Sequence, residues 1–167
     1  MREIPWLTTD SIKMLEELFQ KNPEAKVIEF GCGGSTIWMA QRIKNLITVE
    51  HDKSWQQSVQ ETLNSKKLTN VDLRLLERPY NGVLDQFQDE YFDLVLVDGR
   101  ERRRCILSAL RTVKSGGILM LDNAERSYYH CAFDSLNSWN KTVTMQTGPD
   151  PTGFWYENWQ TTWWIKP

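Results

Sequence analysis

The chain has 167 residues, which is enough to bury the core of one domain and too few for two. Hydrophobic residues make up 40% of it, and its formal net charge of −2 excludes a general electrostatic attraction to nucleic acid or to an anionic membrane. No apolar run reaches the roughly 20 residues of a membrane-spanning helix, and residues 1–10 lack the apolar core of a signal peptide.

Amphipathic and apolar segments alternate along the chain. The first amphipathic segment places Ile12, Leu15 and Phe19 on one face of a helix. Helices are predicted at residues 8–22, 35–44, 54–67, 102–113 and 126–139. Strands are predicted at residues 25–30, 46–50, 71–77, 92–99, 118–123, 141–148 and 161–166.

This alternation predicts an α/β fold, a doubly wound sheet with helices on both faces. The last two predicted strands differ, because only a loop at residues 149–160 joins them, and so short a connection requires antiparallel pairing. We therefore expect a seven-stranded, mostly parallel sheet with an antiparallel last strand. No repeat or linker divides the sequence, so we expect a single domain over residues 1–167, with a helical segment at 1–24 and the core at 25–167.

The segment VIEFGCGGST, residues 27–36, carries an apolar strand into a glycine-rich turn and then into a helix. In a doubly wound sheet, ligands bind at the carboxyl ends of the strands, where this turn would lie. Glu50 ends the next predicted strand, and a carboxylate there can accept both hydroxyls of a ribose. The pattern favours a nucleoside cofactor, although a tight turn beside a surface carboxylate would give the same pattern.

Two cofactors compete for this turn. A dinucleotide site uses the spacing GxGxxG; Gly31 and Gly33 fit its first two positions, but Thr36 occupies the third. Glu29 places a negative charge close to where phosphates would bind, and it suits the amino group or sulfonium of S-adenosylmethionine better. A nicotinamide-dependent oxidoreductase remains as an alternative, as does a non-catalytic nucleoside-binding module.

Five segments in this order resemble the class I S-adenosylmethionine-dependent methyltransferases, namely VIEFGCGGST, ITVEHD, FDLVLVDG, SGGILMLDN and TTWWIKP. The resemblance covers the chain from about residue 25 to its end, and it implies a Rossmann-like fold and methyl transfer. It also implies that Glu29, Gly31 and Gly33 border the methionine part of the cofactor. Ser35 or Thr36 would contact the methionine carboxylate.

At the adenosine end, the resemblance assigns the ribose to Glu50 and places His51 near the adenine. Glu77 and Arg78, which follow the third predicted strand, would flank the adenine edge. Asp98, at the end of the fourth predicted strand, is a further candidate for cofactor contact. Together these residues would hold S-adenosylmethionine along the carboxyl edge of the sheet.

Asp98, Asp122 and Asn123 end two buried strands that are expected to be neighbours. Two carboxylates and an amide oxygen suit Mg²⁺, and the set is similar to that of the catechol O-methyltransferase type, in which the ion orients the acceptor. A metal-free alternative makes Asp98 or Asp122 a general base. An ordinary helix cap and turn would also place these residue types here.

The segment DGRERRRC concentrates arginines where a helix N-terminus disfavours positive charge. Arg100 comes first and is the best placed to contact the acceptor, and Arg126 could join it to bind a carboxylate or a phosphate. We expect methylation of a small-molecule or sugar hydroxyl, with no nucleic-acid or membrane partner. Because the chain is short, a second copy could complete the acceptor pocket, so a homodimer is considered.

Aromatic residues are concentrated near the end of the chain, where Trp155, Tyr156 and Trp159 either cap the site or close the sheet edge. Trp6, near the start, is either a lid or a packing residue. The three cysteines are an odd number without CxxC spacing, so we expect reduced thiols and a cytoplasmic location.

Overall fold

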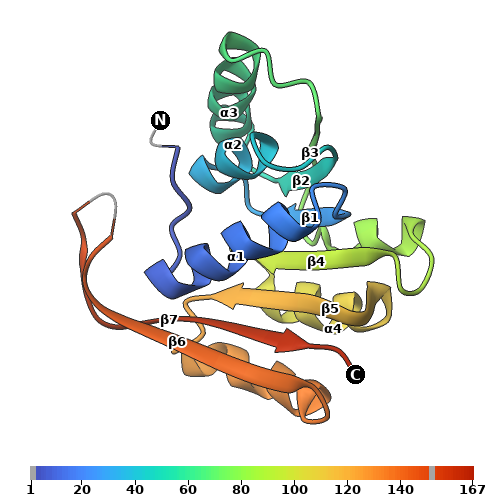
Figure 1. Ribbon diagram of the computed structural model, residues 1–167, viewed down its shortest axis with the longest axis vertical. Helices are drawn as coiled ribbons and strands as arrows, with labels where there is room; N and C mark the ends of the chain where they lie inside the picture. Colours follow the sequence, from blue (N-terminus) through green and yellow to red (C-terminus); the bar gives the residue numbers. More distant parts are fainter. Residues whose placement is uncertain (1–2, 151–152) are drawn as a thin grey trace.

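The structure is a computed structural model that describes residues 3–150 and 153–167. A seven-stranded sheet forms its centre (Figure 1). Its order is β3-β2-β1-β4-β5-β7-β6. The strands are β1 (Val27–Phe30), β2 (Leu46–Glu50), β3 (Val71–Leu75), β4 (Phe92–Val97), β5 (Val113–Asp122), β6 (Asn140–Pro149) and β7 (Trp155–Ile165). Among these strands, β7 alone runs opposite to the other six, which confirms the predicted sheet and its reversed last strand.

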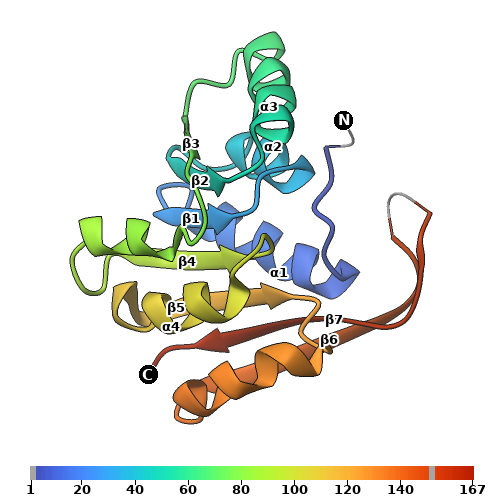
Figure 2. The ribbon, with the colours of Figure 1, turned by 180° about the vertical axis from the view of Figure 1, so that it is seen from behind.

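Helices cover both faces of this sheet. They are α1 (Thr9–Lys21), α2 (Gly34–Ala40), α3 (Lys53–Ser65) and α4 (Arg102–Thr112), with 3-10 segments η1 (Asn81–Gln86) and η2 (Ser127–Leu136). Figure 2 shows α4 and η2 on the face opposite α1. The predicted helix at 35–44 therefore ends at Ala40, and the one at 126–139 forms 3-10 rather than α structure.

Strand β4 explains why two layers of helix form. Successive side chains of a strand point to opposite faces. Leu94 and Leu96 pack with the cluster that contains α1 and α2, whereas Val95 and Val97 pack with the cluster that contains α4. A continuous apolar run therefore buries both faces of the central strand.

The predicted loop at 149–160 is mostly strand. Residues 151–152 of it lie outside the described part, but β6 and β7 pair from Asn140↔Ile165 to Pro149↔Trp155. Aromatic residues favour pleated strands, which explains why Trp155–Gln160 continues the ladder. The resulting hairpin extends past the carboxyl ends of the parallel strands, on the side where the N-terminal segment also runs (Figure 1).

The N-terminal segment is fixed where it meets this hairpin. The backbone N–H of Thr8 donates to Thr161 Oγ1 of β7 at 3.1 Å, and Glu3 pairs with Lys66 at 2.9 Å. Residues 1–2 of the predicted N-terminal segment lie outside the described part. Within residues 3–150 and 153–167, every helix falls short of the length and apolarity needed to cross a membrane.

Candidate active site

A cavity of about 930 Å³ lies at the carboxyl ends of the parallel strands. Its floor comes from the turn after β1 (residues 31–35), the end of β2 (50–52), the turn after β4 (98–100) and the end of β5 (122–123). Trp6, Trp55, Tyr156 and Trp159 add aromatic walls. This is the edge at which doubly wound sheets bind ligands, as the sequence predicts.

Gly31 and Gly33 lie in the turn after β1, and glycine is needed at each position for a different reason. Gly31 has a φ of +101°, and a Cβ there would lie 2.6 Å from the Cα and N of Gly99. The packing of two strand-end turns therefore requires glycine at position 31. A Cβ on Gly33 would meet only Trp55, at 3.9 Å, among the described residues. Gly33 is thus the position at which a ligand in the cavity can approach the backbone.

Glu29 lies beneath this turn, fully buried, and does not line the cavity among the described residues. Its carboxylate accepts hydrogen bonds from the hydroxyls of Ser35, Thr36 (2.6 Å) and Thr48 (3.0 Å). Burial raises the pKa of Glu29 to about 7. Its predicted place beside the methionine is therefore corrected, because the side chain organises the turn from below.

Thr36 and Ser35 also serve this local network. The hydroxyl of Thr36 accepts the backbone N–H of Gly33 at 2.9 Å and donates to Glu29, and the residue is fully buried. Ser35 lines the cavity, although its hydroxyl donates to Glu29. Of these two predicted contacts for the methionine carboxylate, only Ser35 reaches the cavity in the described structure.

Glu50 connects the end of β2 to the turn after β1. Its Oε1 accepts the backbone N–H groups of His51 (2.7 Å) and Asp52 (2.9 Å) and lies 2.7 Å from His51 Nδ1. Its Oε2 accepts the N–H of Cys32 at 3.2 Å. A carboxylate oxygen can accept more than one hydrogen bond, so Oε2 keeps acceptor capacity for a ligand hydroxyl.

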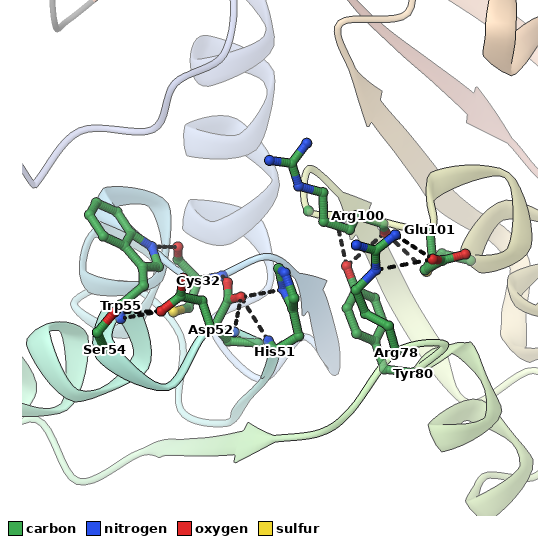
Figure 3. A network of polar contacts seen from close by, with 12 residues as sticks. Cys32, His51, Asp52, Ser54, Trp55, Arg78, Tyr80, Arg100 and Glu101 are labelled. Atoms are coloured by element: carbon green, nitrogen blue, oxygen red, sulfur yellow. Dashed lines mark hydrogen bonds and ion pairs between the residues drawn. The ribbon is translucent and has the colours of Figure 1, made fainter.

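Trp55 is a cavity residue that the sequence analysis did not identify. Asp52 caps α3 by accepting the backbone N–H of Trp55 at 3.0 Å. The indole Nε1 then donates to the carbonyl of Cys32 at 2.5 Å, which places the ring beside Gly33 (Figure 3). A tryptophan in the first turn of an otherwise polar helix, five residues after Glu50, was the available signal.

Glu77 and Arg78 are exposed, and neither is among the described residues that line the cavity. Arg78 instead pairs with Glu101, at 3.0 Å from Nε and 2.7 Å from Nη2 to Oε1 (Figure 3). The predicted contact of these two residues with the adenine edge is therefore corrected. The loop after β3 braces the turn after β4.

The buried guanidinium of Arg102 lies among the predicted metal ligands. Its Nε donates to the carbonyl of Gly99 at 2.8 Å, and its Nη2 donates to the carbonyl of Asp98 at 2.5 Å and to Asp98 Oδ1 at 3.1 Å. Its Nη1 donates to the carbonyl of Asp122 and to Asn123 Oδ1 at 3.3 Å. All five N–H groups of the guanidinium are therefore used.

A magnesium ion does not fit this arrangement. The strand ends do bring Asp98, Asp122 and Asn123 together. The positive group among them is the guanidinium of Arg102. The Oδ1 atom of Asp122 is occupied by Trp159 Nε1 at 3.0 Å and Thr161 Oγ1 at 2.8 Å. No group of three acidic, histidine or cysteine side chains within the described residues could hold a metal. The predicted Mg²⁺ site is corrected accordingly.

The two aspartates differ in their exposure. The side chain of Asp98 is 23% exposed, and burial raises its pKa. Asp122 is 3% exposed, and burial together with the nearby charge of Asp98 raises its pKa further. Arg102 opposes both shifts. Both carboxylates line the cavity, and burial favours the protonated form of each.

Solved structures of several enzymes share this fold. A provisionally assigned O-methyltransferase from Klebsiella pneumoniae aligns with a TM-score of 0.72 and 23% identity, over 96% of this chain and 82% of that one. Precorrin-6y C5,15-methyltransferase from Geobacter metallireducens gives 0.73 and 14%, over 100% and 94%. The tRNA (m1A58) methyltransferase TrmI from Aquifex aeolicus gives 0.71 and 14%, over 100% and 72%. At these identities the likeness establishes the fold and leaves the acceptor open.

The fold and the cavity together define a class I S-adenosylmethionine-dependent methyltransferase with a Rossmann-like sheet. A family model described as a methyltransferase domain matches residues 28–124, more than half of the sequence, and the chain belongs to that family. No curated protein matches the sequence. The chain is therefore an enzyme that uses S-adenosylmethionine as its methyl donor.

Proposed function

We propose that this enzyme methylates a hydroxyl of a small molecule without a metal ion, with Asp98 as the general base. The observation that carries the proposal is the carboxylate of Asp98, which lines the cavity while Arg102 occupies the centre of the strand-end oxygens. A hydroxyl must lose its proton as it attacks the methyl group. A carboxylate with a raised pKa is a stronger proton acceptor than an ordinary aspartate.

The cofactor would lie across the ends of β1 and β2. We assign the ribose hydroxyls to Glu50, whose Oε2 retains acceptor capacity, and the adenine side to His51. The methionine part would lie along the turn of Gly31, Gly33 and Ser35. A cavity of about 930 Å³ has room for this cofactor and for a small acceptor beside it.

A small acceptor is favoured by the aromatic walls. Tyr156 and Trp159 stack with ring centroids 5.3 Å apart, and Trp6 lines the same cavity from the N-terminal segment. Such walls suit an aromatic or sugar ring and restrict the width of what can enter. The methyl group would then pass in line from sulfur to oxygen, and the protein would contribute mainly by positioning the reactants.

Transfer of labelled methyl groups to a panel of phenols and sugars, in the presence of EDTA, tests this function. Turnover should persist in EDTA, and Asp98→Asn should lower kcat by about 100-fold or more while S-adenosylhomocysteine binds with unchanged affinity. Asn keeps the shape of the side chain and an oxygen that accepts from Arg102, so we expect the variant to fold. Activity that vanishes in EDTA and returns with Mg²⁺ would contradict the proposal.

A further inference from the structure

Among the residues that the structure describes, three arginines line the cavity, namely Arg100, Arg102 and Arg126, and their guanidinium groups differ in their partners. That of Arg102 is fully engaged, with Asp98 among its acceptors. The Nε of Arg126 lies 3.8 Å from Glu125. The guanidinium of Arg100 makes no hydrogen bond or ion pair with any residue that the structure describes, and Figure 3 shows it pointing away from the contacts of its own turn.

The backbone of Arg100 is nevertheless held firmly. Its N–H donates to the hydroxyl of Tyr80 at 2.5 Å, and its carbonyl accepts from the same hydroxyl at 2.7 Å. Tyr80 itself is buried against Phe30 with ring centroids 5.8 Å apart. The side chain of Arg100 therefore starts from a fixed point, and it extends along the cavity lining as an exposed charge.

The acidic residue that follows Arg100 in the sequence is already paired with other arginines. Glu101, the next residue, is already bound to Arg78 at 2.7 Å and lies 3.7 Å from Arg104. The positive charges of Arg102 and Arg126 both favour the ionised form of Asp98. Arg100 and Arg126 line the same cavity as this candidate base.

We propose that Arg100 binds an anionic group of the methyl acceptor, a carboxylate or a phosphate ester, with Arg126 as the second positive charge. This rests on the proposed function, because it takes the Asp98 side of the cavity as the acceptor side. A guanidinium matches both groups with two parallel N–H donors. A free arginine in a partly enclosed cavity is stabilised by an anionic ligand, which neutral phenols and sugars cannot supply.

Binding of anions to the protein loaded with S-adenosylhomocysteine tests this without any turnover. Inorganic phosphate and 4-hydroxybenzoate would be titrated at constant ionic strength, with tryptophan fluorescence as readout and 4-hydroxybenzamide as the neutral comparison. We expect saturable binding of at least one anion and weaker binding of the amide. Arg100→Gln should lower the affinity for the anion by about tenfold. Arg103→Gln removes an equal charge outside this cavity and should leave that affinity unchanged.

The affinity for S-adenosylhomocysteine separates this proposal from the proposed function. An unchanged affinity in Arg100→Gln, with the anion lost, supports acceptor binding. A lower affinity would assign Arg100 to the methionine carboxylate of the cofactor and overturn the proposal. The proposal would also fail if neither anion binds, or if both variants lower the affinity for the anion equally. Failure of S-adenosylhomocysteine to bind the unaltered protein would instead count against the cofactor site.

Discussion

Glu29 is a carboxyl group that the fold buries completely under its ligand-binding turn. Its pKa rises from 4.5 to about 7 because burial disfavours the charged form. Below pH 4.5 both the folded and the unfolded chain carry the proton, and the stabilising contribution is complete. As pH rises through 7, the folded state must release that proton, so the contribution is lost.

We therefore predict that the free energy of unfolding falls between pH 4.5 and pH 8 by up to about 3 kcal/mol on account of Glu29. Glu29→Gln removes the titration and keeps acceptor and donor atoms for Thr36 and Thr48. Urea denaturation across this pH range should show a flatter dependence in the variant. Parallel curves for the two proteins would show that Glu29 is not the group responsible.

Individual partners are also where the sequence is least informative. The segment DGRERRRC contains several arginines that the sequence cannot tell apart, yet only Arg102 among those at positions 100–104 is buried. Which one turns inward depends on the positive φ of Glu101 and on the path of the turn after β4. The oxygens of Asp98, Asp122 and Asn123 were predictable as a cluster, but the cation at their centre was not.

At the scale of an element, the turn after β1 is fixed by its contact with the turn after β4. Gly116 provides a matched comparison for Gly31, since both have positive φ but a Cβ at Gly116 would meet nothing within 4 Å among the described residues. Gly116→Ala should cost about 1–2 kcal/mol of backbone strain. Gly31→Ala adds a clash with Gly99 and should cost about 3 kcal/mol or more.

Chemical denaturation of the two glycine variants measures this difference directly. Equal losses of unfolding free energy would mean that the Gly31–Gly99 approach is relaxed in solution. A larger loss in Gly31→Ala would establish that the first glycine of the motif serves the protein and leaves ligand approach to Gly33.

The hairpin of β6 and β7 contains a strand where the sequence predicted a loop. The sequence predicted a loop at residues 149–160, but pairing with β6 lets Trp155–Gln160 adopt extended structure. That pairing brings Tyr156 and Trp159 to the cavity, and it lets Trp159 bind Asp122 at 3.0 Å. Cross-strand partners such as Gln146 and Trp159, or Met145 and Gln160, lie beyond the reach of local patterns.

For the whole molecule, a mostly parallel sheet with a reversed last strand could be predicted because apolar runs alternate with amphipathic ones until the last two strands. That alternation requires a parallel sheet, and the parallel sheet brings the carboxyl ends of β2, β1, β4 and β5 to one edge. Gly33, Glu50 and Asp98 thus meet in one cavity although they are far apart in the sequence. The exposed positions of Glu77 and Arg78 depend on the loop after β3, which no strand pattern specifies.

The central claim is that this cavity holds S-adenosylmethionine, with its ribose on Glu50 and without a metal ion. Calorimetric titration of S-adenosylhomocysteine in EDTA, into the unaltered protein and into Glu50→Gln, tests it most directly. We predict one cofactor bound per chain, an affinity at least tenfold lower in the variant at an unchanged melting temperature, and no binding of NAD. Equal affinity in the two proteins, or binding that requires added Mg²⁺, would contradict the account.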